Sequence, residues 1–139
     1  MFNMFKSQVS LDLNPRNCLA VSLIYCMAAD GEVDPEEIGH LMSVLGRNAT
    51  RQQLDAAVRY ARSTQPDQFL AEVAPKLRPE QRLCIILNMI DSAMSDGEAE
   101  PEEQQLIMRF AQAFGLSEGE LTPYFRALVA KNDRAVLDR

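Results

Sequence analysis

The sequence predicts an all-α fold, a compact single-domain bundle of about seven helices. Three observations support this prediction. Apolar residues recur at helical spacing, and no segment of strand length alternates apolar with polar residues while being rich in β-branched side chains. Prolines and capping residues divide the chain into segments of helical length. The 139 residues, 47% of them hydrophobic, suffice for one core and leave no room for a second full-sized domain.

The first two helices have clear starts and stops. Asn14 followed by Pro15 is a typical helix N-terminus, and the apolar run after it continues until Asp30-Gly31. Asp34 then precedes Pro-Glu-Glu, which combines a capping acid with a first-turn proline and with glutamate three residues after the cap. The second helix is expected to stop at Gly46.

The next three helices are separated by prolines. Thr50 can cap a third helix that runs through Arg62. Gln65-Pro66 interrupts the helical pattern, and a short fourth helix follows it. Pro79 can open a long fifth helix.

The last two helices follow the same logic. Pro101 opens the sixth helix, which is expected to end near Gly115. Residues 117–120 form another capping-box pattern, and Thr122-Pro123 is predicted to start the last helix. The predicted helices therefore span about residues 15–29, 35–45, 51–62, 67–77, 79–95, 101–115 and 123–131, between an N-terminal segment 1–13 and a C-terminal tail 132–139.

The sulfur-containing residues are expected in the core. Three cysteines lie in apolar runs without CxxC spacing, which disfavours a disulfide framework or a zinc ribbon and predicts buried, reduced thiols at Cys18, Cys26 and Cys84. Five methionines fall on apolar helical positions and are expected to fill the core: Met27, Met42, Met89, Met94 and Met108.

The chain shows no export signal and no membrane segment. Its longest nearly apolar run, Cys18 to Ala29, has twelve residues, and a bilayer-spanning helix needs about 20. The first residues lack a basic region followed by a hydrophobic stretch of signal-peptide length. We therefore expect a cytoplasmic protein with no transmembrane segment.

One segment of the chain occurs twice. Shifted by 66 residues, ADGEVDPEE at 29–37 aligns with SDGEAEPEE at 95–103, and the apolar helix before each copy aligns as well. The repetition predicts an internal duplication of a helical hairpin, with repeat halves at about 14–65 and 79–121 related by a pseudo-twofold axis. The first and fifth helices are then expected to lie together at the centre.

The negative charge of the protein is concentrated in these two copies. The net charge is −6, but residues 30–37 and 96–103 contain ten of the twenty acidic residues and no basic ones. The remainder of the chain has fourteen basic and ten acidic residues, a net of +4. An overall acidic chain argues against a nucleic-acid-binding function, since such proteins need a concentrated positive surface. Another protein could bind through the acidic turns.

Carboxylates in this pattern match the second half of an EF-hand calcium loop, with glycine at loop position 6 and glutamate at position 12. Positions 1 and 3 would be Cys26 and Ala28, or Ser92 and Met94, so a standard EF-hand is absent. The turns could hold a divalent cation, calcium or magnesium rather than zinc, or could simply cap helices in solvent; the residues leave both interpretations open. The candidate metal ligands are Asp30, Glu32, Asp34, Glu37, Asp96, Glu98, Glu100 and Glu103.

The duplicated arrangement resembles the TerB-like tellurite-resistance family over about residues 14–121. Its features are a helix ending in ADG, a capping acid, a glutamate opening the next helix, a second copy some sixty residues later, and an apolar helix ending in FGLS. The resemblance implies an all-helical cytoplasmic domain at 14–131, similar also to the N-terminal domain of membrane-bound DnaJ-type co-chaperones. It further implies a link to tellurite and other chemical-stress responses, and a metal-binding or scaffolding role at Asp30, Glu37, Asp96 and Glu103. Ser95 and Ala99 depart from the family pattern.

An enzyme is the least favoured class. Glu37 and His40 have the Glu-x-x-His spacing of di-iron proteins, but the repeat has Leu106 where a second histidine would be needed. A serine or cysteine nucleophile needs a base, and the chain has one histidine. The hypotheses are therefore a non-enzymatic domain with a cation-binding turn, an acidic protein-interaction module without metal, and a carboxylate-metal enzyme.

Overall fold

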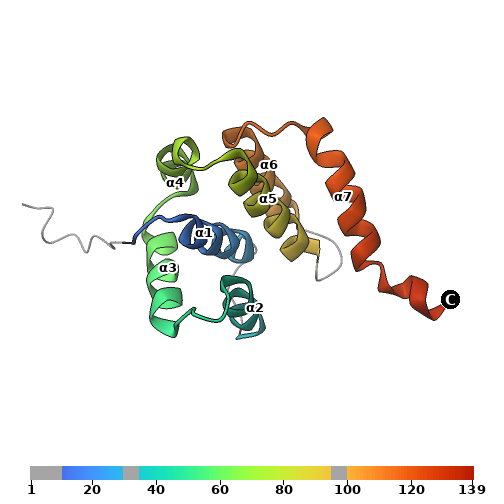
Figure 1. Cartoon of the computed structure of the whole chain (residues 1–139), viewed down its shortest axis with the longest axis horizontal. Helices are drawn as coiled ribbons and strands as arrows, with labels where there is room; N and C mark the ends of the chain where they lie inside the picture. Colours follow the sequence, from blue (N-terminus) through green and yellow to red (C-terminus); the bar gives the residue numbers. More distant parts are fainter. Residues whose placement is uncertain (1–10, 30–34, 95–99) are drawn as a thin grey trace, which may run out of the picture.

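The computed structural model describes residues 11–29, 35–94 and 100–139, and these residues form an all-α structure (Figure 1). The prediction of an all-helical bundle is confirmed: the described residues contain seven α-helices and no strand. The helices are α1 (Pro15–Ala28), α2 (Pro35–Leu45), α3 (Arg51–Ser63), α4 (Pro66–Val73), α5 (Pro79–Met94), α6 (Pro101–Ala113) and α7 (Glu118–Asn132). No helix in the described ranges has the length and apolarity needed to span a bilayer.

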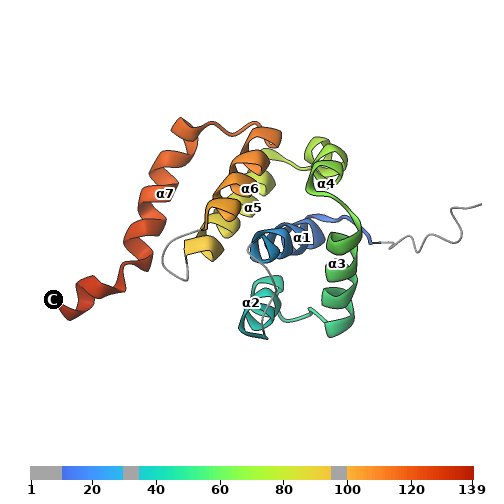
Figure 2. The same cartoon turned by 180° about the vertical axis from the view of Figure 1, so that it is seen from behind.

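Helix α1 lies at the centre of the protein. The Asn14 side chain accepts a hydrogen bond from the Asn17 amide at 2.8 Å and caps the first turn. Every residue from Cys18 to Met27 is buried. The polar member of this run, Ser22, donates its hydroxyl to the Cys18 carbonyl at 2.7 Å, so its burial leaves no unsatisfied donor. Figures 1 and 2 show α1 between α2 and α3 on one side and α5 and α6 on the other.

Helices α1 and α5 pack against each other and run in the same direction. Near their N-terminal ends, Arg16 and Leu19 lie beside Gln81 and Cys84. Further along, the Cys26 thiol lies 3.8 Å from the Met89 carbonyl oxygen. The C-terminal ends of both helices therefore lie at the same end of the bundle, and this is where the two acidic segments leave them.

Aromatic rings fill the space above α1, where α4 and α6 cover it. Phe69 and Phe110 are completely buried, and their ring centroids are 6.1 Å apart. The Tyr25 ring meets both of them edge-on, at 5.7 and 6.3 Å. Its hydroxyl donates to the Thr64 carbonyl at 2.6 Å, so a polar group inside the core is paired.

Two arginines satisfy carbonyl groups at the ends of helices. Arg16 of α1 donates through Nη1 to the carbonyls of Val44 and Leu45 at the end of α2, both at 3.3 Å. Arg82 of α5 donates through Nη1 to the carbonyl of Phe114 at 3.4 Å and through Nη2 to the carbonyl of Ala74. Arg82 thus joins the end of α4 to the end of α6.

The start of the last helix differs from the prediction. Helix α7 begins at Glu118, not after Thr122, and Pro123 lies inside it. The Ser117 hydroxyl accepts from the Glu120 amide at 3.2 Å, and the Glu120 carboxylate accepts from the Ser117 amide at 3.3 Å. This reciprocal cap starts the helix early enough for the proline to be included in it.

Helix α7 is the least buried helix, because none of its residues is fully buried. Leu121, Leu128 and Asn132 form its half-buried line toward the body. Residues 133–139, which we call the C-terminal arm, are all exposed and contain a short 3₁₀ helix at Arg134–Asp138 instead of the plain tail predicted for 132–139. The arm projects away from the bundle at the end marked C in Figure 1.

Candidate functional site

The structure describes three of the eight candidate metal ligands. Asp30, Glu32, Asp34, Asp96 and Glu98 lie outside the described residues. Glu37 is the third residue of α2 and Glu103 the third residue of α6, and both are half-buried. Glu100 is the exposed N-cap residue of α6.

Glu103 connects α6 to the end of α1. Its Oε1 accepts a hydrogen bond from the Glu100 amide at 3.3 Å, as in a capping box. Its Oε2 lies 3.7 Å from the Cys26 Sγ, which can donate to it from the last turn of α1. A carboxylate that follows the second acidic segment is therefore held against the helix that precedes the first one.

Further contacts bring the same ends together. Ala28 and Ala29, the last described residues before the first acidic segment, share a surface hollow of about 320 Å³ with Glu102 and Gln105 of α6. The first turns of α6, which follow the second acidic segment, thus lie beside the end of α1, which precedes the first one.

The carboxylates described here could contribute to a site for a hard cation. Glu37 and Glu103 supply oxygen donors, which calcium and magnesium prefer. Within residues 11–29, 35–94 and 100–139, no group of three or more His, Cys, Asp or Glu side chains could hold a metal ion. A complete ligand set would therefore need carboxylates from residues 30–34 and 95–99 as well.

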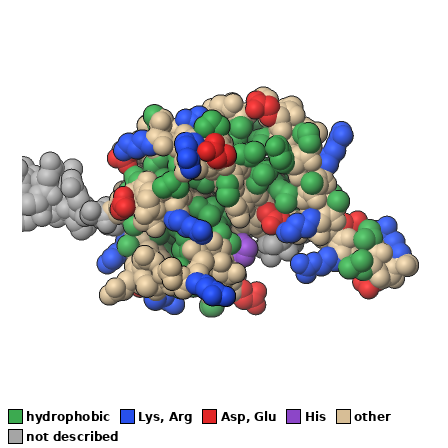
Figure 3. All heavy atoms as spheres, in the orientation of Figure 1, with side chains coloured by type: hydrophobic (Ala, Val, Ile, Leu, Met, Phe, Trp, Pro, Cys, Tyr) green, Lys and Arg blue, Asp and Glu red, His purple; other side chains and the backbone are tan. Residues whose placement is uncertain are grey.

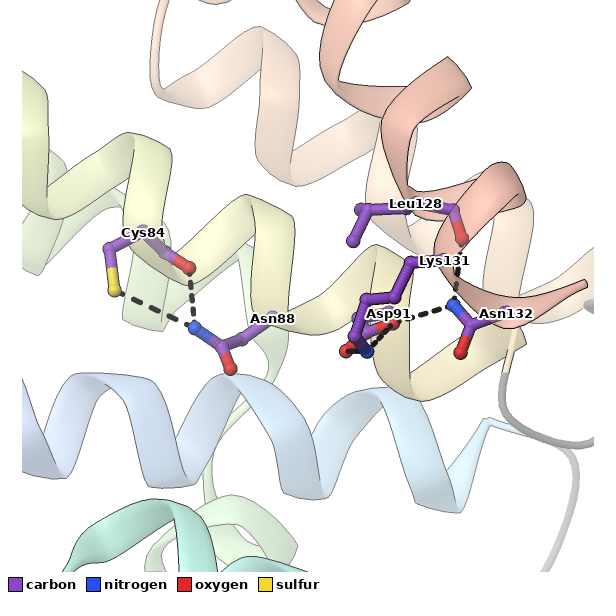
Figure 4. Close-up of polar contacts among 6 residues, drawn as sticks. All are labelled: Cys84, Asn88, Asp91, Leu128, Lys131 and Asn132. Atoms are coloured by element: carbon purple, nitrogen blue, oxygen red, sulfur yellow. Dashed lines mark hydrogen bonds and ion pairs between the residues drawn. The ribbon is translucent and has the colours of Figure 1, made fainter. Parts of the chain in front are cut away.

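The sequence analysis missed a polar cluster between α5 and α7 (Figure 4). The Asp91 carboxylate accepts hydrogen bonds from Lys131 Nζ at 2.9 Å and from Asn132 Nδ2 at 2.8 Å. Burial alone would raise the pKa of Asp91, but these hydrogen bonds and the nearby positive charges lower it below its ordinary value. The cluster joins residues forty positions apart, a pairing that no local sequence pattern indicates.

We expect the Asp91 cluster to hold α7 only above acidic pH. Because the pKa is lower in the folded state than in the unfolded state, the stabilisation is present above about pH 4 and is lost as pH falls through the folded-state pKa. Lys131 is more than half exposed, so the contribution is less than about 1 kcal/mol. Amide hydrogen exchange across α7 should accelerate in Asp91→Ala at neutral pH. In the control Asp55→Ala, which breaks an exposed pair with Arg51, exchange in α7 should not change. Equal exchange in the unmodified protein and in both variants would contradict this role of Asp91.

The thiols differ from one another in accessibility. Cys18 and Cys26 are buried as predicted, and burial together with the charges of Glu72 and Asp12 raises the pKa of Cys18 to about 11. The prediction was wrong for Cys84, which is exposed and lies 3.6 Å from the Asn88 side-chain nitrogen (Figure 4). It lies at the edge of the contact between α5 and α1, where it lines an open surface hollow of about 430 Å³ together with Arg16 and Leu19.

A second correction concerns Met108, which was expected in the core and is 56% exposed. It lines a surface groove of about 710 Å³ between α5, α6 and α7. The other apolar residues of this groove are Ile90, Ala93, Met94, Ile107, Leu121 and Phe125.

Comparison with known proteins identifies a family. The family model described as tellurite resistance protein TerB matches residues 16–123, which cover α1 from its second residue, α2 to α6, and the first six residues of α7. No curated protein and no solved structure matches the chain.

Proposed function

Because the chain belongs to the TerB family of tellurite-resistance proteins, we propose that it is a non-enzymatic domain of that stress response whose two acidic turns together bind a divalent cation. The proposed ligands come from both copies of the repeat. They are drawn from Asp30, Glu32, Asp34, Glu37, Asp96, Glu98, Glu100 and Glu103.

The contact between Glu103 and the last turn of α1 carries this proposal. The Cys26 thiol lies 3.7 Å from Glu103 Oε2. In the sequence, Cys26 comes four residues before Asp30, the first acid of the first copy. Ala29, the last described residue before the first acidic segment, lines the same surface hollow as Glu102 of α6. These contacts between α6 and the end of α1 support a site that draws ligands from both copies.

Electrostatics favour a cation at this end of the bundle. Ten carboxylates in two eight-residue segments, with no lysine or arginine among them, repel one another. The N-terminal ends of α2 and α6 offset part of this repulsion through their dipoles. A bound divalent ion would offset more of it, and oxygen-rich sites of this kind select calcium or magnesium over zinc.

Thermal unfolding with and without divalent ions tests the proposal. A ligand that binds only the folded state at one hundred times its Kd stabilises it by about 2.7 kcal/mol, so Tm should rise by several degrees in millimolar calcium or magnesium relative to chelator. Manganese and zinc are compared in the same way.

A double variant identifies the site. Glu37→Gln combined with Glu103→Gln should remove most of the metal-dependent rise in Tm. The matched control is Glu36→Gln with Glu102→Gln, which removes the same charge from the exposed neighbouring positions of the same two helix turns. No shift in Tm at millimolar ion, or an equal loss in both double variants, would contradict the proposed site.

A further inference from the structure

Cys26 is a buried polar residue at the end of a helix that is otherwise apolar there. Its side chain is completely buried in the last turn of α1. The hydroxyl of its neighbour Tyr25 is already paired with the Thr64 carbonyl at 2.6 Å. Of residues 23–29, Cys26 is therefore the one whose side chain remains to donate a hydrogen bond to another helix.

Two acceptors among the described residues lie within reach of this thiol, whose single proton can serve one of them at a time. The Met89 carbonyl oxygen of α5 lies 3.8 Å from Sγ, and Glu103 Oε2 of α6 lies 3.7 Å from it. A carbonyl inside a helix accepts from the amide four residues later, which for Met89 is that of Ala93. An ionised carboxylate is also the stronger acceptor. The proton is therefore directed to Glu103.

The same carboxylate is restrained at its other oxygen. Glu103 Oε1 accepts from the Glu100 backbone amide at 3.3 Å. One oxygen is thus held by the cap of α6 and the other by α1. An ionised carboxylate has about four lone-pair sites, so each oxygen keeps the capacity to coordinate a cation in addition to these contacts. A side chain that is already held in place loses less conformational entropy when an ion binds to it.

Carboxylates elsewhere on the described surface are dispersed among basic residues. On the face drawn in Figure 3, acidic and basic side chains are interspersed over the described part of the chain. Asp55, for example, pairs with Arg51 at 3.3 Å. Residues 30–37 and 96–103, in contrast, contain no lysine or arginine. Glu103 belongs to the second of these segments and is held against α1 by the Cys26 contact.

We propose that Cys26 is a positioning residue of the cation site, with its thiol donating to Glu103 Oε2 and holding that carboxylate in the orientation in which it binds the ion. This inference rests on the proposed function, because it concerns the same site. Hydrogen-bond partners that orient metal ligands typically contribute about 10- to 100-fold to metal affinity. A thiol is a weak donor, so the lower end of this range is expected.

The second copy of the repeat indicates which replacement should keep this role. Cys26 is the third residue from the end of α1, and Ser92, 66 positions later, is the third residue from the end of α5. A serine hydroxyl is a hydrogen-bond donor like the thiol. Cys26→Ser therefore retains a donor, whereas Cys26→Ala removes it and leaves a side chain that is smaller by one atom.

Titration calorimetry on the full chain, with calcium chloride and separately with magnesium chloride, measures the effect. Cys26→Ala should raise the Kd of the bound ion about tenfold, and Cys26→Ser should recover most of that loss. The matched control is Cys18→Ala, which removes an equally buried thiol from the other end of α1, where it donates to the Leu13 carbonyl at 3.4 Å. Its Kd should equal that of the unmodified protein.

The outcomes of this titration separate the inference from the proposed function. If the unmodified protein binds neither ion, the proposed function is contradicted and the inference fails with it. If the unmodified protein binds an ion and Cys26→Ala binds it equally well, only the inference is overturned. An equal loss of affinity in Cys18→Ala would also overturn it, because the effect would then come from lost packing in α1.

Infrared spectroscopy tests the contact in the absence of metal. The S–H stretching band of Cys26 is the band that disappears in Cys26→Ala. In chelator it should move to higher frequency in Glu103→Gln, because a neutral amide oxygen is a weaker acceptor than a carboxylate. The control Glu102→Gln, at the exposed neighbouring position, should leave the band in place. A band that does not move in Glu103→Gln would show that the thiol does not donate to Glu103, and would overturn the inference whether or not the protein binds an ion.

Discussion

Replacing Phe110 with alanine is expected to destabilise the protein by about 3 to 5 kcal/mol. Phe110 is completely buried, and its ring lies 6.1 Å from that of Phe69, 6.0 Å from that of Phe114 and 6.3 Å from that of Tyr25. Alanine removes the ring from all three contacts and leaves a cavity where α1, α4 and α6 meet. Edge-on aromatic pairs add to the burial energy that is lost.

Urea unfolding at low protein concentration measures this loss. The control is Phe125→Ala, because Phe125 is the same residue type but half exposed, and we expect it to cost less than about 1 kcal/mol. The slope of the unfolding free energy against urea should be unchanged in both variants. Similar losses at Phe110 and Phe125 would mean that the core does not lie where the aromatic rings meet.

Replacing Arg82 with methionine is expected to cost about 2 to 4 kcal/mol. The guanidinium donates to the Ala74 and Phe114 carbonyls, which end α4 and α6. Methionine retains much of the side-chain volume but donates to neither oxygen. Hydrogen bonds from charged groups contribute more than neutral ones, and both carbonyls would lose a partner at partly buried positions.

A second arginine serves as the control for Arg82. Arg78 is more than two-thirds exposed and pairs with the exposed Glu80. Arg78→Met should change the free energy of unfolding by less than about 0.5 kcal/mol. Thermal unfolding measures the stability of both variants, and the circular dichroism spectrum of each shows whether its helices are retained. If Arg82→Met proved as stable as Arg78→Met, the two carbonyls would have to be satisfied in another way.

Much of the fold could be predicted because its signals are local. Proline opens α1, α2, α4, α5 and α6, and each of these starts was predicted within one residue. The apolar run before Asp30 predicted the central position of α1, since a helix that is apolar on all sides has to be enclosed.

What could not be predicted depends on distant neighbours. The sequence predicts that Pro123 starts a helix, but the reciprocal cap formed by Ser117 and Glu120 starts it earlier, at Glu118. The exposure of Met108 is decided by how far α7 stands from α6, which helical spacing within α6 does not encode.

The candidate site shows the same division. Residue type and spacing predict Glu37, Glu100 and Glu103 as candidate metal ligands. All three lie in the first turns or caps of helices, where acidic residues are favourable. The proximity of Glu103 to Cys26 joins residues 77 positions apart, so it depends on the parallel packing of α1 and α5. The interaction of Asp91 with Lys131 and Asn132 is equally remote in the chain.

The parallel pairing of α1 and α5 also affects the order in which the protein can fold as it is synthesised. Residues 18–27 are buried on all sides in the finished structure, but α5 begins at Pro79 and α6 at Pro101. A ribosome adds about 5 to 20 residues per second, so this apolar segment waits several seconds for the helices that cover it. During that interval the nascent chain presents the kind of surface that chaperones bind, and a fragment that ends before Pro79 is expected to aggregate.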